Sequence, residues 1–187
     1  MKILDVGCGN AKTRGAIGID FNAHTAADIV HDLNCYPWPL PDDAFDQIVC
    51  QHIVEHVADF VRFVEEVHRV ARAGARVEIV TPHFSSRFSY TDPTHLRHLS
   101  LFAFDYFINH PPFNPALISR AFETQSPLVE FYARVRFEKT RVFLRFARPF
   151  RLTGIQWLAN RFPYFYEAYL AFIFPARDLY FTLTVIK

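Results

Sequence analysis

The chain has 187 residues, a formal net charge of +1 and three cysteines. This length favours one domain, residues 1–187, which can bury roughly 70% of the surface of its unfolded chain without disulfides. Cys8, Cys35 and Cys50 are odd in number and lack metal-site spacing, which predicts reduced, buried thiols in a cytoplasmic protein. The near-zero charge argues against a strong nucleic-acid field. We expect no secretory signal, because Asp5 and the glycine turn interrupt the apolar N-terminus. We also expect no membrane span, because the longest apolar candidate has about 15 residues where roughly 20 are needed.

Charged and aromatic residues are unevenly distributed along the chain. Residues 1–119 hold 9 Lys and Arg against 14 Asp and Glu, whereas residues 120–187 hold 11 against 5. Aromatic residues make up 17% of the chain and include 21 Phe. The basic, aromatic C-terminal third therefore predicts an interfacial surface for a lipid-linked molecule, a cover over a substrate pocket, or ordinary core packing.

The first twenty residues predict a nucleoside pocket. Residues 2–6 form an apolar run that stops at Gly7-Cys8-Gly9, which indicates a buried strand and a glycine turn. A second apolar run ends at Asp20, as a neighbouring parallel strand would. Ligands of open parallel sheets bind outside the carboxyl ends of the strands, where glycines admit close backbone approach. A carboxylate at the next strand tip can accept hydrogen bonds from both ribose hydroxyls.

Missing features narrow the choice of nucleoside. A dinucleotide fingerprint needs a third glycine and an acid about 20 residues on, whereas here no third glycine is in register and Asp20 follows Gly9 by only eleven residues. No full crossover helix fits that gap, so a pyrophosphate would lack its helix N-terminus. The acid-x-Gly-x-Gly pattern from Asp5 to Gly9 resembles the first motif of class I S-adenosylmethionine-dependent methyltransferases, whose cofactor carries no phosphate.

The resemblance implies an α/β fold with a Rossmann-like, seven-stranded, mostly parallel sheet, in which the last strand is antiparallel and the first crossover helix is reduced or absent. It implies a cofactor-binding half, residues 1–110, and an acceptor-side half, residues 111–187. Among these methyltransferases, the chain most resembles a type 11-like bacterial subset. That subset has a similar glycine motif and a "DPTH" stretch, here Asp92-Pro93-Thr94-His95. This similarity covers about residues 3–107.

Further elements follow in chain order. After a short third strand, residues 28–31, the alternating prolines of residues 35–43 exclude a helix and predict an extended lid over the sheet edge. A fourth strand (residues 45–50), an amphipathic helix over residues 54–70 capped by Ala73-Gly74, and a fifth strand (residues 76–80) form a crossover unit. The remaining predictions are a helix from Ser100 through residue 107, a strand or hairpin in residues 129–146, helices in residues 152–158 and 164–174, and a terminal strand in residues 180–186.

The resemblance assigns the cofactor S-adenosyl-L-methionine to residues at these strand ends. Asp32 and Leu33 match the positions that meet adenine, although an Asx turn closing the strand is the alternative. Lys12 or Arg14 is expected to pair with the methionine carboxylate, or else to be a solvated loop charge. The cofactor-binding candidates are Asp5, Gly7, Cys8, Gly9, Asn10, Lys12, Asp20, Phe21, Asp32, Leu33, Gln51 and His52.

Residues 52–56, His-Ile-Val-Glu-His, raise the question of a metal. Two histidines four apart with an acid between them match a zinc-peptidase order, and on a helix both rings would share a face. A similar phrase occurs in the methyltransferase family without metal. We therefore expect no metal, with Gln51 and His52 along the methionine arm and Glu55-His56 in the first helical turn.

The catalytic candidates near this edge are His83, Asp92 and His95, since histidine suits general-base chemistry near neutral pH. A purely structural role for Asp92 and His95 within their loop is the alternative. We expect methyl transfer to a small-molecule, glycan or lipid-linked acceptor, with peripheral membrane contact through the C-terminal third and no nucleic-acid partner. Two other functions remain open: a non-catalytic nucleoside-binding module, and a zinc-dependent hydrolase using His52, Glu55 and His56.

Overall fold

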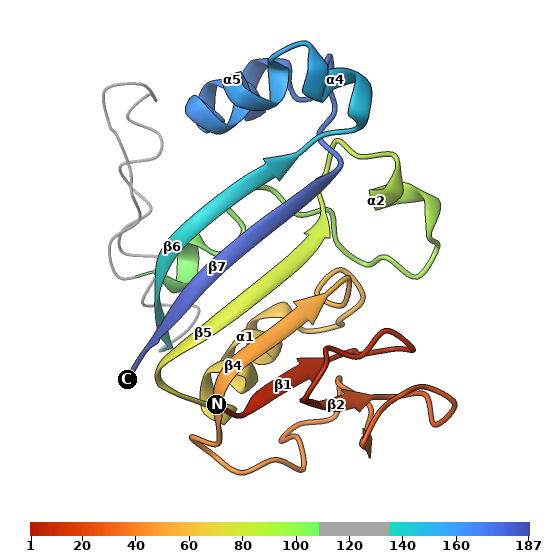
Figure 1. The fold of residues 1–187 in the computed structure, drawn as a ribbon, viewed down its shortest axis with the longest axis vertical. Coiled ribbons are helices and arrows are strands. Elements are labelled where there is room, and N and C mark those ends of the chain that lie inside the picture. Colours follow the sequence, from red (N-terminus) through yellow and green to blue (C-terminus); the bar gives the residue numbers. More distant parts are fainter. Residues whose placement is uncertain (109–134) are drawn as a thin grey trace.

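A computed structural model describes residues 1–108 and 135–187 of the chain. Its core is a seven-stranded sheet with the order β3-β2-β1-β4-β5-β7-β6 (Figure 1). β7 is antiparallel to both of its neighbours, and the other pairs are parallel. The strands are β1 (Ile3–Val6), β2 (Ala16–Asp20), β3 (Ile29–Val30), β4 (Phe45–Gln51), β5 (Ala71–Pro82), β6 (Arg136–Arg145) and β7 (Asp178–Ile186). The predicted fold class, including the antiparallel last strand, is confirmed.

The first crossover contains no helix. Residues 7–15 connect β1 to β2 through turns, as the short spacing predicted, and the segments before β3 and β4 are also irregular. The crossover between β4 and β5 carries helix α1 (Phe60–Val70). Its first turn is capped by Asp59, whose carboxylate accepts a hydrogen bond from the Arg62 amide at 3.0 Å, in the usual manner of an N-cap acid.

The two faces of the sheet differ in character. One face carries the buried apolar side chains of the central strands, such as Val6, Cys50 and Ile79, and α1 contributes Phe63 and Val67 to the same core. The alternate residues of these strands point to the other face, because side chains alternate along a strand. There β4, β5, β7 and β6 present half-buried or exposed residues: Gln47, Arg76, Glu78, Tyr180, Thr182, Arg141 and Phe143. This second face is therefore the more polar of the two.

Several predicted boundaries are wrong. Residues 54–59 are turns rather than helix, although Val54 and Val57 are buried as expected. Ala73-Gly74 does not cap α1, since β5 already begins at Ala71. Gly74, at φ +76, instead lies where the pairing of β4 with β5 shifts register. A β-bulge uses the left-handed conformation that glycine supplies.

The remaining corrections concern the segments around β6. Residues 100–107 form turns and one short 3₁₀ helix, η1 (Asp105–Phe107), in place of a regular helix. The strand or hairpin predicted in residues 129–146 is the single strand β6 where the chain is described, and residues 129–134 lie outside the described part. The two predicted helices after β6 are four short pieces: α4 (Arg148–Leu152), α5 (Ile155–Arg161), α6 (Pro163–Phe165) and the π-turn η4 (Tyr166–Leu170). The thiol of Cys35 is exposed, whereas Cys8 and Cys50 are buried as predicted.

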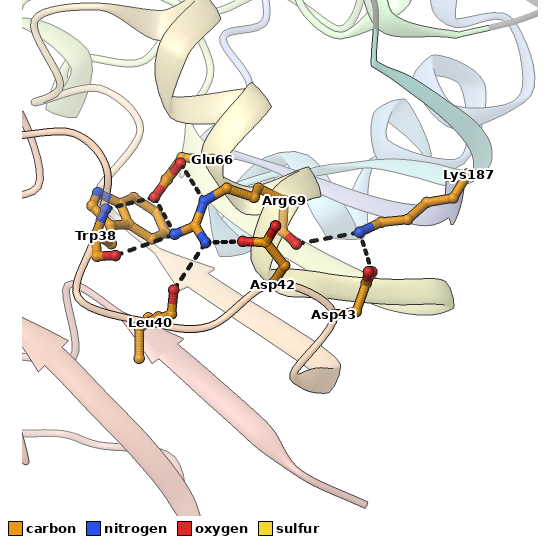
Figure 2. A network of polar contacts seen from close by, with 7 residues as sticks. All are labelled: Trp38, Leu40, Asp42, Asp43, Glu66, Arg69 and Lys187. Atoms are coloured by element: carbon orange, nitrogen blue, oxygen red, sulfur yellow. Dashed lines mark hydrogen bonds and ion pairs between the residues drawn. The ribbon is translucent and has the colours of Figure 1, made fainter.

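The proline-rich segment is anchored at the amino edge of the sheet rather than forming a lid over the carboxyl edge. Trp38 is 2% exposed, and its backbone amide donates to Glu66 at 2.6 Å. Figure 2 shows the Arg69 guanidinium between Glu66, Asp42 and the carbonyl groups of Trp38 and Leu40. At the end of β7, Lys187 pairs with Asp43 and donates to the Arg69 carbonyl. These contacts join the segment before β4, the end of α1 and the end of β7.

Within the described ranges, the helices are all too short or too polar to cross a bilayer.

Candidate functional site

The glycine turn and Asp20 meet at the carboxyl edge of β1 and β2. Gly7 and Gly9 have φ values of +68 and +49, which glycine adopts readily. The Gly9 amide donates to one Asp20 oxygen at 2.9 Å, and the Asn22 amide donates to the other at 2.9 Å. A Cβ built on Gly9 would meet nothing within 4 Å, so this backbone borders open space. The turn is therefore held against a carboxylate beside room for a ligand.

Neighbouring contacts fix the shape of this turn. The Asp5 carboxylate is 4% exposed and accepts a hydrogen bond from the Thr13 amide at 2.6 Å. The Lys12 ammonium donates to both oxygens of Asp28, at 2.8 and 2.9 Å, and these bonds hold the pKa of Asp28 below its usual range. Lys12 thus pairs with a protein carboxylate, which is neither of the two roles that we expected for it. Burial raises the pKa of the Cys8 thiol, so it packs as a neutral group.

Asp32 forms the Asx turn that the sequence left open as an alternative, and Leu33 is buried next to it. Asp32 accepts hydrogen bonds from the amide and the side chain of Asn34, at 2.9 and 3.2 Å, which is an Asx turn. The Asn34 amide holds the pKa of Asp32 below its usual range. Leu33 is 4% exposed and its carbonyl accepts from the Trp38 indole. Of the other cofactor candidates, Asn10, Phe21, Gln51 and His52 are exposed at the same edge.

A cavity of about 610 Å³ lies at the carboxyl ends of β4 and β5. Its lining unites the residues after β4, the loop around helix α2 (Phe88–Thr91) and the start of β7, which Figure 1 shows near the tip of β5. Because β7 runs antiparallel, its first residue lies at this edge. The lining residues are His52, Glu55, His56, Pro82, Phe88, Thr91, Asp92, Pro93, His95, Arg177 and Asp178.

His52 and Glu55 line this cavity and lie in a strained turn that follows β4. His52 has φ +53, an uncommon conformation for a residue with a side chain. Its Nδ1 lies 3.3 Å from Glu55 Oε1, and this carboxylate raises the pKa of His52. Glu55 is 1% exposed, and neither of its oxygens has a well-aligned hydrogen-bond partner among the described residues. Because the segment is a turn and not a helix, His52 and His56 do not share a helical face, and the zinc-peptidase arrangement is wrong.

The predicted DPTH loop packs directly on this turn. The His56 and His95 rings lie edge to face with centroids 4.6 Å apart. His56 Nδ1 lies 3.0 Å from the Thr94 hydroxyl, which donates to Asp92 at 2.6 Å. The Leu96 amide donates to the Glu55 carbonyl at 2.8 Å, which joins the two backbones. The structure therefore brings together two sequence motifs whose contacting residues, His56 and Thr94, are 38 positions apart in the chain.

His83 does not belong to this cavity. It is 0% exposed, and its ring nitrogens contact the Ser85 hydroxyl at 2.7 Å and the Glu167 carboxylate at 3.1 Å. Glu167 also accepts from Ser100 and from the Leu101 amide. A fully buried imidazole with both nitrogens engaged cannot reach an acceptor, so the geometry gives His83 a structural role in place of the expected catalytic one.

The sequence did not place Arg177 and Asp178 at this site, and it placed Glu55 in a helical turn rather than as a buried carboxylate of the cavity wall. Burial raises the pKa of Asp178, and the Arg177 guanidinium lies over the Phe88 ring at 5.2 Å. The signal that could have found Arg177 and Asp178 is the predicted antiparallel direction of the last strand, since it places the start of that strand at the ligand edge.

Comparisons with known proteins agree with this geometry. The sequence profile of a family described as a methyltransferase domain matches residues 4–79. A probable S-adenosylmethionine-dependent methyltransferase of Mycolicibacterium smegmatis is 33% identical over 119 residues, which cover 52% of this chain and 46% of the relative. Residues 4–79 are therefore similar to a methyltransferase domain, and the relatives that the chain matches are named S-adenosylmethionine-dependent methyltransferases. The cofactor of this family is S-adenosylmethionine.

Other relatives of this methyltransferase domain define how far the comparison extends. A probable S-adenosylmethionine-dependent methyltransferase of Mycobacterium tuberculosis is 30% identical over 118 residues, covering 52% of this chain and 43% of the relative. The chain thus matches less than half the length of these curated relatives. A solved methyltransferase structure from Archaeoglobus fulgidus has a TM-score of 0.52 at 20% identity, over 98% of this chain and 85% of that one. At that identity the likeness shows the shared fold.

Proposed function

We propose that this chain binds S-adenosylmethionine at the tips of β1 and β2 and transfers its methyl group to an acceptor held in the 610 Å³ cavity. The observation that carries the proposal is the pairing of the Gly9 amide with the Asp20 carboxylate beside open space. The two halves of the reaction then lie on adjacent strands, because the sheet order is β2-β1-β4-β5.

The residues at the β1 and β2 tips fit the nucleoside part of the cofactor. Each Asp20 oxygen accepts one backbone hydrogen bond, and a carboxylate oxygen has a further lone pair for a ribose hydroxyl. Gly9 leaves its Cβ position open, where a larger residue would approach the ligand. Exposed Asn10, Phe21 and Gln51 surround the same edge. When bound, the cofactor supplies a methyl group on a positively charged sulfur, which keeps the bonding electron pair as the methyl group leaves.

The acceptor side is assigned to the cavity because polar and aromatic residues converge there. Asp92 and His95 line it, and their loop is fixed by hydrogen bonds from Thr94 to Asp92 and from His95 to the Ser89 carbonyl at 3.1 Å. The hydroxyl and the amide of Thr94 hold the pKa of Asp92 below its usual range, so it is an anion that can accept a hydrogen bond from an acceptor hydroxyl.

The surface beyond the cavity favours a lipid-linked acceptor over a free metabolite. We call the apolar side chains of residues 152–173 the aromatic surface. Its members are Leu152, Trp157, Phe162, Phe165, Tyr169, Phe172 and Ile173, each at least 43% exposed. Residues 146–177 hold four arginines and one acid, Glu167, whose side chain is buried. Exposed aromatic residues with cationic neighbours are typical of helices that lie in the interface of an anionic membrane.

Contacts connect the aromatic surface to the cavity. The Phe172 ring lies 5.4 Å from the ring of Phe84, in the segment that leads from β5 into the cavity loop. Arg177 follows the surface in the chain and lines the cavity. A membrane-bound acceptor would therefore reach the cavity without crossing the rest of the molecule.

Titration calorimetry with S-adenosylmethionine and S-adenosylhomocysteine tests the cofactor half. We expect saturable binding by the natural chain and at least a tenfold larger dissociation constant for Asp20→Ala, since two charge-assisted hydrogen bonds contribute roughly 1.5 to 3 kcal/mol each. Asp42→Asn, at the opposite edge of the sheet, is the matched control and should bind normally. No binding at millimolar concentration by the natural chain would refute the proposal, and binding without transfer to any acceptor would favour a non-catalytic module.

Vesicle co-sedimentation tests the acceptor class. The chain should bind vesicles that contain phosphatidylglycerol and not vesicles of phosphatidylcholine alone, because charge complementarity contributes to binding. The double variant Leu152→Ser with Trp157→Ser should lose this binding, whereas Val30→Ser, an exposed apolar residue on β3, should keep it. Equal binding of both variants would refute a role of the aromatic surface in this binding, and absence of vesicle binding by the natural chain would argue for a free metabolite as the acceptor.

A further inference from the structure

Glu55 is a buried acid without a satisfying partner. Its side chain is 1% exposed, both oxygens lack aligned hydrogen bonds among the described residues, and its one ion-pair contact is with the half-exposed His52 ring. A buried charge without hydrogen bonds is costly, and such groups are retained where they bind something or take part in chemistry. Glu55 also lines the cavity, so its oxygens are placed to meet a ligand.

Two imidazoles stand next to this carboxylate. Glu55, His56 and His95 each offer a ligand atom, and these atoms all lie within 4.8 Å of one another. The group draws on two loops that the fold joins through the Leu96 to Glu55 backbone hydrogen bond and through Arg97, which donates to the Ala58 carbonyl at 2.5 Å. The cluster is thus built by tertiary structure from both motifs.

The Nδ1 atoms of the His56 and His95 rings each contact a neighbouring oxygen atom, which orients the ring. His95 Nδ1 faces the Ser89 carbonyl at 3.1 Å, which accepts only, so this nitrogen carries the proton and Nε2 keeps its lone pair. The Thr94 hydroxyl donates to Asp92 and is therefore left to accept from His56 Nδ1, which again leaves Nε2 free to coordinate. Metal-binding histidines are oriented in this way, by an oxygen acceptor behind the ring.

We propose that Glu55, His56 and His95 bind a divalent first-row transition-metal ion at the wall of the cavity. Two imidazoles and one carboxylate are a ligand set of catalytic zinc sites, in which bonds of about 2.0–2.2 Å leave a fourth position open. The same set also suits manganese or iron, whereas magnesium and calcium prefer oxygen ligands. A small approach of the three side chains closes the present separations to coordination distance.

This site differs from both metal hypotheses that the sequence raised. The zinc-peptidase order used His52 and His56 on a helix, and our preferred expectation was no metal. In the structure His52 stays outside the ligand set, and His95 of the DPTH stretch takes its place. Asp92 and Thr94 become positioning residues behind His56. If the proposed methyl transfer is correct, the open position of the ion would hold an oxygen atom of the acceptor; the metal site itself does not depend on that reaction.

Calorimetry with the metal ion alone tests the site. The purified chain is stripped with a chelator, dialysed and titrated separately with Zn²⁺, Mn²⁺ and Mg²⁺. We expect one equivalent of Zn²⁺ or Mn²⁺ to bind and Mg²⁺ to bind at least about tenfold more weakly. Glu55→Gln, His56→Gln and His95→Gln should each weaken transition-metal binding by at least about a hundredfold, whereas His24→Gln, at an exposed histidine outside the cluster, should leave it unchanged.

Two further variants separate ligation from general damage to the loop. Thr94→Val removes the hydroxyl behind His56 and should weaken metal binding by about 10- to 100-fold, as outer-shell changes do, and Thr94→Ser should restore it. Circular dichroism and the unfolding midpoint of each variant, measured in chelator, verify that the fold is retained.

Absence of one-equivalent binding by the natural chain, or binding that survives all three ligand substitutions, would overturn the proposal. Binding of S-adenosylhomocysteine in chelator is measured in parallel. A chain that binds the nucleoside and no metal ion refutes only the metal site, and a chain that binds the metal ion and no nucleoside refutes only the proposed function.

Discussion

The two edges of the sheet differ in whether their buried carboxylates are hydrogen-bonded. At the amino edge, Arg69 bonds to Glu66, Asp42 and two carbonyl groups, so a quarter-exposed guanidinium satisfies a buried carboxylate. At the carboxyl edge, Glu55 is more deeply buried and has no aligned hydrogen bond among the described residues. Buried polar groups in a fold are normally satisfied, and exceptions gather at functional sites. We therefore expect substitutions at the amino edge to change stability most and substitutions of Glu55 to change ligand binding.

The largest expected effect is at the amino edge. Arg69→Met leaves Glu66 buried next to Trp38 without its cation, and breaking a buried ion pair costs about 3–5 kcal/mol of unfolding free energy. Denaturant unfolding measures this change. Asp42→Asn removes only an exposed partner and should cost less than about 1 kcal/mol. Similar losses for both variants would show that the network is not centred on Glu66 and Arg69.

The second effect compares Gly7, which follows β1 at the carboxyl edge, with Gly15, which precedes β2 at the amino edge. Gly7 and Gly15 both have positive φ, +68 and +79, so alanine strains the backbone at either position. A Cβ on Gly7 would lie 2.7 Å from Ile53, whereas a Cβ on Gly15 meets nothing within 4 Å. Gly7→Ala should therefore lower the unfolding free energy by about 1–3 kcal/mol more than Gly15→Ala, the range for overpacking. If denaturant unfolding shows equal losses of unfolding free energy for both variants, the Ile53 side chain moves aside at little cost.

Substitution of Glu55 should raise the unfolding free energy, whereas substitution of Arg69 should lower it. In chelator, Glu55→Gln removes an unsatisfied buried charge, and we expect the unfolding free energy to rise by about 1 kcal/mol. The same variant should lose metal binding, so stability and function change in opposite directions. Thermal and denaturant unfolding test this, and a loss of stability would indicate that the contact with His52 stabilises the fold.

The smallest expected change in unfolding free energy comes from substitutions on the aromatic surface. The double variant Leu152→Ser with Trp157→Ser changes side chains of residues that are 80% and 68% exposed. Exposed substitutions change the unfolding free energy by about 0.5 kcal/mol or less, so the unfolding midpoint should stay while vesicle binding falls. A large loss of stability would place these side chains in a packed contact instead.

Local features of the candidate site followed from the sequence. The glycine turn, the short first crossover and the acid at the tip of β2 were readable because strand ends and glycine positions depend on neighbouring residues. The start of α1 was predicted six residues too early, at Val54 in place of Phe60. Val54 and Val57 are buried and their spacing is that of a helix, although their backbone is not helical. The pattern of buried residues alone therefore predicted a helix there.

By itself, the sequence determined the parallel strands, the glycine turn and the acid at the edge where β1 and β2 end, and the similarity to S-adenosylmethionine-dependent methyltransferases. Tertiary structure alone decided that Glu55 and His56 would meet His95, and that Arg177 would join them from beside the antiparallel last strand. It also buried His83 behind Glu167 and drew the proline-rich segment to the amino edge. The physical reason is that hydrogen-bond partners and burial depend on which loops the strand order brings together, and this order joins residues that are far apart in the chain.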